Sequence, residues 1–184
     1  MHKSAILWLI LVSLTACDKS AGPQPEPSSP AVTSDSSILM EPLTFADWQT
    51  KLTSYEPDIV VVDMWATWCE SCIERFPKMV ELHKRFSDQG VRFVAMNLDS
   101  RDDKAALDMA NRFLNQISAN FENYAMDENL MQAFEMLDLM SIPAVLIYDR
   151  NGEERYRLTG DNPNNQFTDA DVEAAILNLL AQPG

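Results

Sequence analysis

The chain has 184 residues, 46% of them hydrophobic and 23% charged, which suits a single globular domain of ordinary composition. Its formal net charge of -14 at pH 7 argues against nucleic acid or an anionic membrane surface as a direct partner, because both would repel it. We interpret the charge as a solubility feature rather than as steering towards a basic partner.

Residues 1–16 are predicted to be a signal peptide. His2 and Lys3 form a short polar start, and the apolar run that follows is too short to span a bilayer, which needs about 20 residues. The run ends in the sequence LTAC at residues 14–17, which resembles a bacterial lipobox. The resemblance implies that Cys17 becomes the lipidated first residue of the mature protein. The alternative is an ordinary secretory signal with a stray cysteine.

The cysteine count favours lipidation. Three cysteines leave an odd thiol in an oxidising compartment, and acylation of Cys17 removes it and leaves one pair. Asp18 resembles the signal that keeps Gram-negative lipoproteins in the inner membrane, which implies a location on its periplasmic face. Residues 17–41 are then predicted to be a lipid-anchored linker, because prolines lie there among Ser, Gly and Ala with almost no aliphatic side chains.

Residues 42–184 are predicted to form the folded domain. Thr44 can cap a first helix that directs Phe45, Trp48 and Leu52 inward. Hydrophobic periodicity and turn residues predict strands near 60–62, 93–96, 121–126, 144–148 and 154–158, and helices near 69–83, 102–117, 128–137 and 169–180. Strands that alternate with helices, followed by a hairpin and a helix, predict an α/β three-layer sandwich with a mixed central sheet.

Cys69 and Cys72 lie where the apolar, β-branched strand at 60–62 runs into a helix. At a spacing of three residues the two thiols share one helix face, and the first meets unpaired backbone N–H groups and the positive end of the helix dipole. This environment favours a thiolate, which is the nucleophilic form. We therefore predict that Cys69 is the nucleophile and that Cys72, one turn inward, resolves the mixed disulfide.

The sequence around these cysteines resembles the thioredoxin superfamily. WATWC at 65–69 with Cys72, Asp63 before them and Pro77 after them carries the resemblance, and the WATWC spelling is similar to the TlpA/ResA-like branch. Members of that branch are membrane-tethered, extracytoplasmic thiol–disulfide oxidoreductases of bacteria.

The likeness extends to residues 97–99 and 142–152 and covers roughly residues 44–181. It implies a thioredoxin-like fold, with the helix–strand piece at 121–137 as an insertion into the minimal fold.

Two other interpretations of the cysteine pair stay open at this point. A purely structural disulfide would close a short loop and would constrain the unfolded chain little. Half of a zinc site would need two more ligands, and His83 is the single strong candidate left in the domain. We therefore predict no metal and no cofactor beyond the redox-active disulfide Cys69–Cys72, and we interpret His83 as a packing residue.

Asp63 is predicted to accept the proton of Cys72. A carboxylate in a buried strand is costly unless it is paired or functional, and burial would raise its pKa towards a useful range. Its position matches the buried aspartate of thioredoxins, although a hydrogen-bonded aspartate at a strand end is the alternative. Pro143 matches the cis-proline of the superfamily, and a cis bond would leave the backbone of Ile142 free to pair with a substrate strand. The alternative is a trans-proline that starts a strand.

Four further residues near the cysteines are candidates for substrate contact or redox tuning. Trp68 is predicted to contact substrate, with plain packing as the alternative. Glu70 places a negative charge beside Cys69 and should oppose its ionisation. Ser71 departs from the proline that is more usual in the branch, and Arg75 departs from a frequent glutamate, so the redox potential and the cytochrome-maturation subgroup do not follow from the resemblance.

The resemblance implies a membrane-tethered enzyme that reduces disulfides in exported proteins, with apocytochrome c cysteines as one candidate substrate. Its partners would be protein disulfides or dithiols, a membrane thiol donor of electrons, and the membrane itself through the lipid on Cys17. A disulfide oxidase or isomerase is the nearest enzymatic alternative. A thioredoxin-fold binding module or chaperone with incidental thiols is the alternative from another class.

Overall fold

The structure is a computed structural model that describes residues 37–161, 164 and 166–182. The predicted signal peptide, Cys17 and most of the predicted linker lie outside these residues. The elements in chain order are β1 (Glu41–Leu43), α1 (Phe45–Thr53), β2 (Ile59–Trp65), α2 (Glu70–Phe86), the 3₁₀ helix η1 (Ser87–Gln89), β3 (Val91–Asn97), α3 (Lys104–Gln116), β4 (Glu122–Met126), α4 (Leu130–Met136), β5 (Ala144–Tyr148), β6 (Glu154–Thr159) and α5 (Asp169–Leu180). Among the described residues, none of the helices combines the length and the apolar character that a membrane span requires.

The sheet is built around β2. Its sequence IVVVDMW is buried at every position, as expected for a strand covered on both faces. The strand order is β1-β4-β3-β2-β5-β6, in which β3 lies parallel to β2 and β5 lies antiparallel to it. The predicted three-layer α/β sandwich with a mixed central sheet is confirmed.

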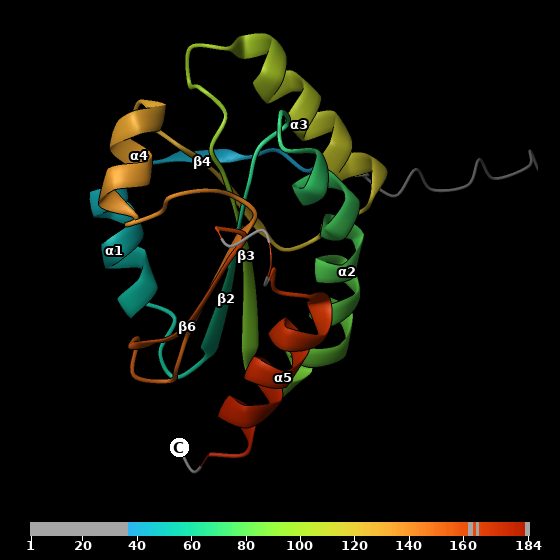
Figure 1. Cartoon of the computed structure of the whole chain (residues 1–184), viewed down its shortest axis with the longest axis vertical. Helices are drawn as coiled ribbons and strands as arrows, with labels where there is room; N and C mark the ends of the chain where they lie inside the picture. The colour runs from blue at the N-terminus through green and yellow to red at the C-terminus, as the bar shows by residue number, and fades with distance from the viewer. Residues whose placement is uncertain (1–36, 162–163, 165, 183–184) are drawn as a thin grey trace, which may run out of the picture. The chain divides into compact units, whose positions relative to one another are not determined.

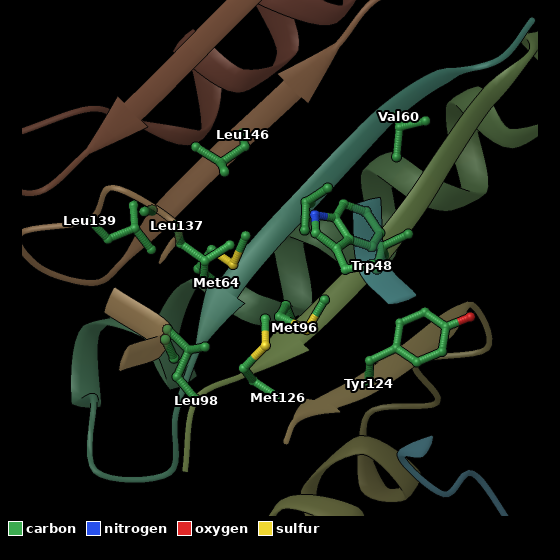
Figure 2. Close-up of a cluster of buried hydrophobic side chains, with 14 of the residues drawn as sticks. Trp48, Val60, Met64, Met96, Leu98, Tyr124, Met126, Leu137, Leu139 and Leu146 are labelled. Atoms are coloured by element: carbon green, nitrogen blue, oxygen red, sulfur yellow. The ribbon is translucent and has the colours of Figure 1, made fainter. Parts of the chain in front are cut away.

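Helices α1 and α4 cover one face of the sheet, as Figure 1 shows. Alternate residues of β2, namely Val60, Val62 and Met64, point into this layer, because side chains alternate between the faces of a strand. Met64 is the register partner of Met96 on β3, and Figure 2 shows both among the aliphatic and aromatic side chains of this core. Trp48 of α1 packs into the same cluster, as its helical spacing predicts.

Helices α2, α3 and α5 cover the opposite face (Figure 1). Ile59 and Val61 of β2 pack there with buried residues of α2 and α5. Trp65, at the end of the strand, packs with both cysteines and with Ala110 and Leu114 of α3, among others. The cysteines are therefore part of a hydrophobic cluster rather than of an exposed loop.

Two features near the ends of elements differ from expectation. Strand β1 is not predicted by the sequence, yet it pairs parallel to β4 at the edge of the sheet. Before it, Ile38 exchanges hydrogen bonds with the side chain of Asn115 on α3, at 2.8 Å and 2.6 Å. Contacts with the domain therefore begin inside the segment that composition assigns to the linker. Three residues carry too little periodicity to reveal a strand whose partner is more than 80 positions away.

The predicted insertion forms β4 and α4. Strand β4 joins the sheet between β3 and β1, so the insertion widens the sheet. Both neighbouring helices start slightly later than predicted, because capping side chains fix their first turns: Asp103 accepts from Ala106 N at α3, and Asn129 accepts from Gln132 N at α4.

Replacing Leu114 by alanine is expected to lower the free energy of unfolding by about 2–5 kcal/mol, because the lost side chain leaves a cavity in the cluster that holds the cysteines. Leu177→Ala is the matched control on another helix, since Leu177 is 47% exposed. It should cost less than about 1 kcal/mol. Urea unfolding of the oxidised protein, followed by circular dichroism, measures both. Equal losses would contradict the core position of Leu114.

Candidate active site

Cys69 and Cys72 form a disulfide with their Cα atoms 5.3 Å apart. Cys69 is the N-cap residue of α2, and its carbonyl accepts hydrogen bonds from the N–H groups of Cys72 and Ile73. Cys69 is 6% exposed and Cys72 is 1% exposed, so Cys69 carries the outer sulfur. The more accessible of the two sulfurs therefore lies at the N-terminus of α2.

The loop before Cys69 is held by a buried carboxylate. Asp99, which follows β3, accepts hydrogen bonds from the backbone N–H of Thr67 at 3.0 Å and from its hydroxyl at 2.8 Å. Asn97 donates its side-chain amide to the same carboxylate and accepts the backbone N–H of Asp99. Sequence reasoning recorded residues 97–99 as a motif but gave them no function. One polar residue at the end of a buried strand and a second just after it were the available signal.

Asp63 lies on the face of β2 that α2 covers, between Val61 and Trp65 in the strand. It is 1% exposed, and its Oδ1 accepts a hydrogen bond from Arg75 Nη1 at 2.6 Å. Burial raises the pKa of Asp63, and the charge and hydrogen bond of Arg75 oppose this rise without cancelling it. Sequence reasoning noted Arg75 as a departure from the branch and missed this ion pair.

The Ile142–Pro143 peptide bond is cis. Because Met64 is the register partner of Ala144, this bond lies beside the end of β2 that leads to the cysteines. Ile142 is partly buried and packs against the cluster that contains Cys69 and Cys72. The structure therefore brings the predicted proline loop and the cysteine pair together.

The remaining predicted residues lie around the disulfide in different environments. Trp68 is 56% exposed directly before Cys69, whereas Trp65 is completely buried. Glu70 and Ser71 are exposed on the first turn of α2, and the Ser71 hydroxyl lies 3.7 Å from Cys69 Sγ. These positions place an apolar ring and a carboxylate at the rim of the cysteine pair.

His83 lies three helical turns beyond Cys72. Its ring packs against the rings of Phe93 and Phe121, with centroids 5.7 Å and 5.2 Å away. Burial lowers the pKa of His83. Across the described part of the chain, no three His, Cys, Asp or Glu side chains gather in a group able to hold a metal ion.

A family model and curated relatives both match this chain, and all of them are thioredoxin-like proteins or thiol–disulfide exchange proteins. The family model described as thioredoxin-like matches residues 57–154. The thiol-disulfide oxidoreductase ResA of Bacillus subtilis is 28% identical over 125 residues, which cover 68% of this chain and 62% of the relative. The thiol:disulfide interchange protein DsbE of Vibrio cholerae is 29% identical over 107 residues, which cover 58% of this chain and 53% of the relative. The chain thus spans less than two thirds of the length of these two curated relatives.

Solved structures agree on the fold. A Chlorobium tepidum protein described as a thiol:disulfide interchange protein DsbE superposes with a TM-score of 0.57 at 28% identity, over 71% of this chain and 85% of the other. A secreted disulfide oxidoreductase of Mycobacterium tuberculosis superposes with a TM-score of 0.53 at 19% identity, over 68% of this chain and 85% of the other. The predicted thioredoxin-like fold is confirmed.

Replacing Asp99 by alanine is expected to lower the free energy of unfolding by about 1–3 kcal/mol, because the N–H of Thr67 loses its acceptor. The looser loop should also let dithiothreitol reduce the disulfide faster. Asp102→Ala, at an exposed acid nearby, is the matched control and should change neither quantity. The assigned function of Asp99 fails if the two variants behave alike in urea unfolding and in reduction rate.

The titration of Asp63 should make stability depend on pH. Because burial raises its pKa, the folded protein retains a proton that the unfolded chain has released, so stability falls as pH rises from about 3.9 through the folded pKa. The free energy of unfolding of the native protein should therefore fall over this window relative to that of Asp63→Asn, which cannot titrate. Urea unfolding at a series of pH values measures the difference. A rising difference would mean that attraction to Arg75 outweighs desolvation.

Proposed function

The chain belongs to the thioredoxin-like family, and from this premise we propose that it is a thiol–disulfide oxidoreductase acting through the Cys69–Cys72 couple. One observation carries the proposal: the disulfide lies at the N-terminus of α2, beside the cis-proline loop and directly after an exposed tryptophan. A disulfide that closes so short a loop adds little stability, whereas its place at a helix terminus suits exchange. The names of the curated relatives describe the same class of reaction.

The reaction transfers two electrons and two protons. In the reduced protein, the Cys69 thiolate attacks a client disulfide, forms a mixed disulfide and releases one client thiolate, which takes a proton from water. The Cys72 thiol gives its proton to Asp63, and its sulfur attacks Cys69 Sγ. The bond between Cys69 and the client breaks, and the second client thiolate leaves and takes a proton from water, to which Asp63 returns the one it accepted. The client becomes a dithiol, and the protein regains the disulfide of the structure.

The residues around the pair have proposed functions in client binding and tuning. Trp68 offers an exposed apolar surface to the client, and the backbone of Ile142, before the cis bond to Pro143, offers hydrogen bonds to an extended client segment. Glu70 opposes thiolate formation at Cys69, and the Ser71 hydroxyl lies close enough to modulate the same sulfur.

We extend the proposal to the location of the protein and to the direction in which electrons flow. We place residues 1–16 as a signal peptide and residues 17–41 as a linker that is lipidated at Cys17, in front of a thioredoxin-like domain at 42–184. The protein would then work outside the cytoplasm on the periplasmic face of the inner membrane. A membrane thiol would supply its electrons, and disulfides of exported proteins, apocytochrome c among them, would receive them.

The equilibrium redox potential decides the direction. Trp65 is buried in the same cluster as both cysteines, so its fluorescence should report a titration against thiol buffers. A reducing thioredoxin has a potential of about -270 mV, and a value close to it supports a reductase. A strong oxidant has a potential of about -120 mV, and a value close to that supports an oxidase or isomerase. The absence of any reversible transition would leave the binding-module interpretation.

Cysteine variants test the reaction itself. Cys69→Ser is expected to abolish the reduction of insulin disulfides, because the attacking sulfur is lost. Cys72→Ser is expected to accumulate a mixed disulfide with the client, since the second thiol is missing. Mass spectrometry under non-reducing conditions detects that adduct.

Cys17→Ser in the full chain is the matched control. It should keep insulin reduction while losing labelled fatty acid and membrane association. If Cys69→Ser folds and retains full activity, the proposed reaction is excluded. If Cys17→Ser keeps its lipid label, the lipidation proposal is excluded.

A further inference from the structure

Arg75 reaches from α2 into the sheet. It lies three residues after Cys72, on the same face of the helix one turn further along. Its Nη1 is 2.6 Å from Asp63 Oδ1, and the two side chains are 11% and 2% exposed. An arginine this deeply placed is paired or costly, and here the pair spans the helix and the central strand.

The outer side of the guanidinium is held by the segment that begins α5. Arg75 Nη2 lies 3.6 Å from Asp169 Oδ1, and the guanidinium carbon lies 4.9 Å from the centre of the Phe167 ring. On its own helix, Nη2 also lies 3.9 Å from Met79 Sδ. Because these contacts come from two elements, the guanidinium is fixed over Asp63 rather than free to rotate into solvent.

Asp63 uses one carboxylate oxygen for this pair and leaves the other unpartnered. Its Oδ2 is buried and has no hydrogen-bond partner within the described residues. Buried acceptors without partners are rare and need an explanation. The carbonyl oxygen of the next residue, Met64, lies 4.0 Å from Cys72 Sγ, so the β2 backbone that follows Asp63 approaches the inner cysteine. The unpartnered oxygen therefore lies in the layer between β2 and α2 that also holds the sulfur of Cys72, the one that must lose a proton.

We propose that Arg75 is a positioning residue for proton transfer, one that binds Oδ1 of Asp63 as a carboxylate and thereby keeps Oδ2 free to take the proton of Cys72. The inference rests on the proposed function and deepens it. The transfer moves one proton from Cys72 Sγ to Asp63 Oδ2, and the sulfur's electron pair then forms the bond to Cys69 Sγ as the client thiolate leaves. Asp63 afterwards releases its proton to water.

The charges around Asp63 explain why an arginine is needed. The charged groups that act on Asp63 are Arg75 on α2 and Asp169 on α5. Cys72 lies in the same layer between β2 and α2, and the register neighbours of Asp63 on β3 and β5 are Ala95 and Val145. Burial and Asp169 raise the pKa of Asp63, and Arg75 alone lowers it. Without the guanidinium, the pKa of Asp63 would rise further, so Asp63 would remain a carboxylate able to accept the proton of Cys72 only at higher pH.

The test compares Arg75→Gln with Arg85→Gln. Arg85 lies on the same helix and also pairs with an acid of α5, Glu173, but is exposed and does not contact Asp63. The measured step is the first-order oxidation of the reduced protein that remains at saturating oxidised glutathione, followed by tryptophan fluorescence across pH. Arg75→Gln should shift the pH midpoint of this step upward by about 1–3 units. Arg85→Gln should leave the midpoint in place. Arg75→Lys, which keeps the positive charge, should return the midpoint most of the way to its native value.

A second readout does not depend on turnover. In the oxidised protein, the carboxyl carbon of Asp63, identified by NMR through its loss in Asp63→Asn, should titrate at higher pH in Arg75→Gln than in the native protein. If both readouts stay unchanged in folded Arg75→Gln, or if Arg85→Gln shifts them equally, the inference is overturned. If the native protein shows no exchange at all while the NMR shift persists, the proposed function fails but the coupling between Arg75 and Asp63 stands.

Discussion

The packing of α2 against β2 is the contact on which the active site depends. The strand is buried at every position, and the helix lies along one of its faces. Side chains from the two elements therefore come together between them. The helix N-terminus sets the place of the disulfide, and its next turn sets the place of Arg75. The strand contributes Asp63 and Trp65 to the same layer. A change in the depth or register of this contact would separate all of these groups at once.

Two electrostatic effects oppose each other at Asp63 in this contact: desolvation of the carboxylate and its attraction to Arg75. A carboxylate in the middle of a hydrophobic layer loses its hydration, which is costly, and a single ion pair does not fully compensate for that cost. The pKa of Asp63 is raised because the effect of desolvation is larger than the opposing attraction of Arg75. An entirely apolar layer would be the more stable alternative at this position. We therefore attribute the retained charge to the proposed proton transfer from Cys72 rather than to stability.

The disulfide lies between a loop that hydrogen bonds hold in place and an exposed tryptophan side chain. Asp99 holds the approach to Cys69 through several hydrogen bonds to Thr67, and the cysteines themselves are almost completely buried. Trp68, between Thr67 and Cys69, is exposed. Under the proposed function, a client would contact the Trp68 ring and the N-terminus of α2 on a loop that these hydrogen bonds hold in place. Such an arrangement lets the site bind without prior ordering of its own backbone, which favours binding because less entropy is lost.

Local pattern in the sequence determined the order and type of nearly all elements, because β-branched runs, helical periodicity and capping residues act over a few positions. It also determined the cysteine pair at a helix start. Strand β1 escaped because it is short and its partner is distant. The contacts of Asp63 with Arg75 and of Asp99 with Thr67 escaped as well, since they join residues 12 and 32 positions apart. Only the folded sheet decides such pairs, because side-chain direction and depth depend on how the layers pack.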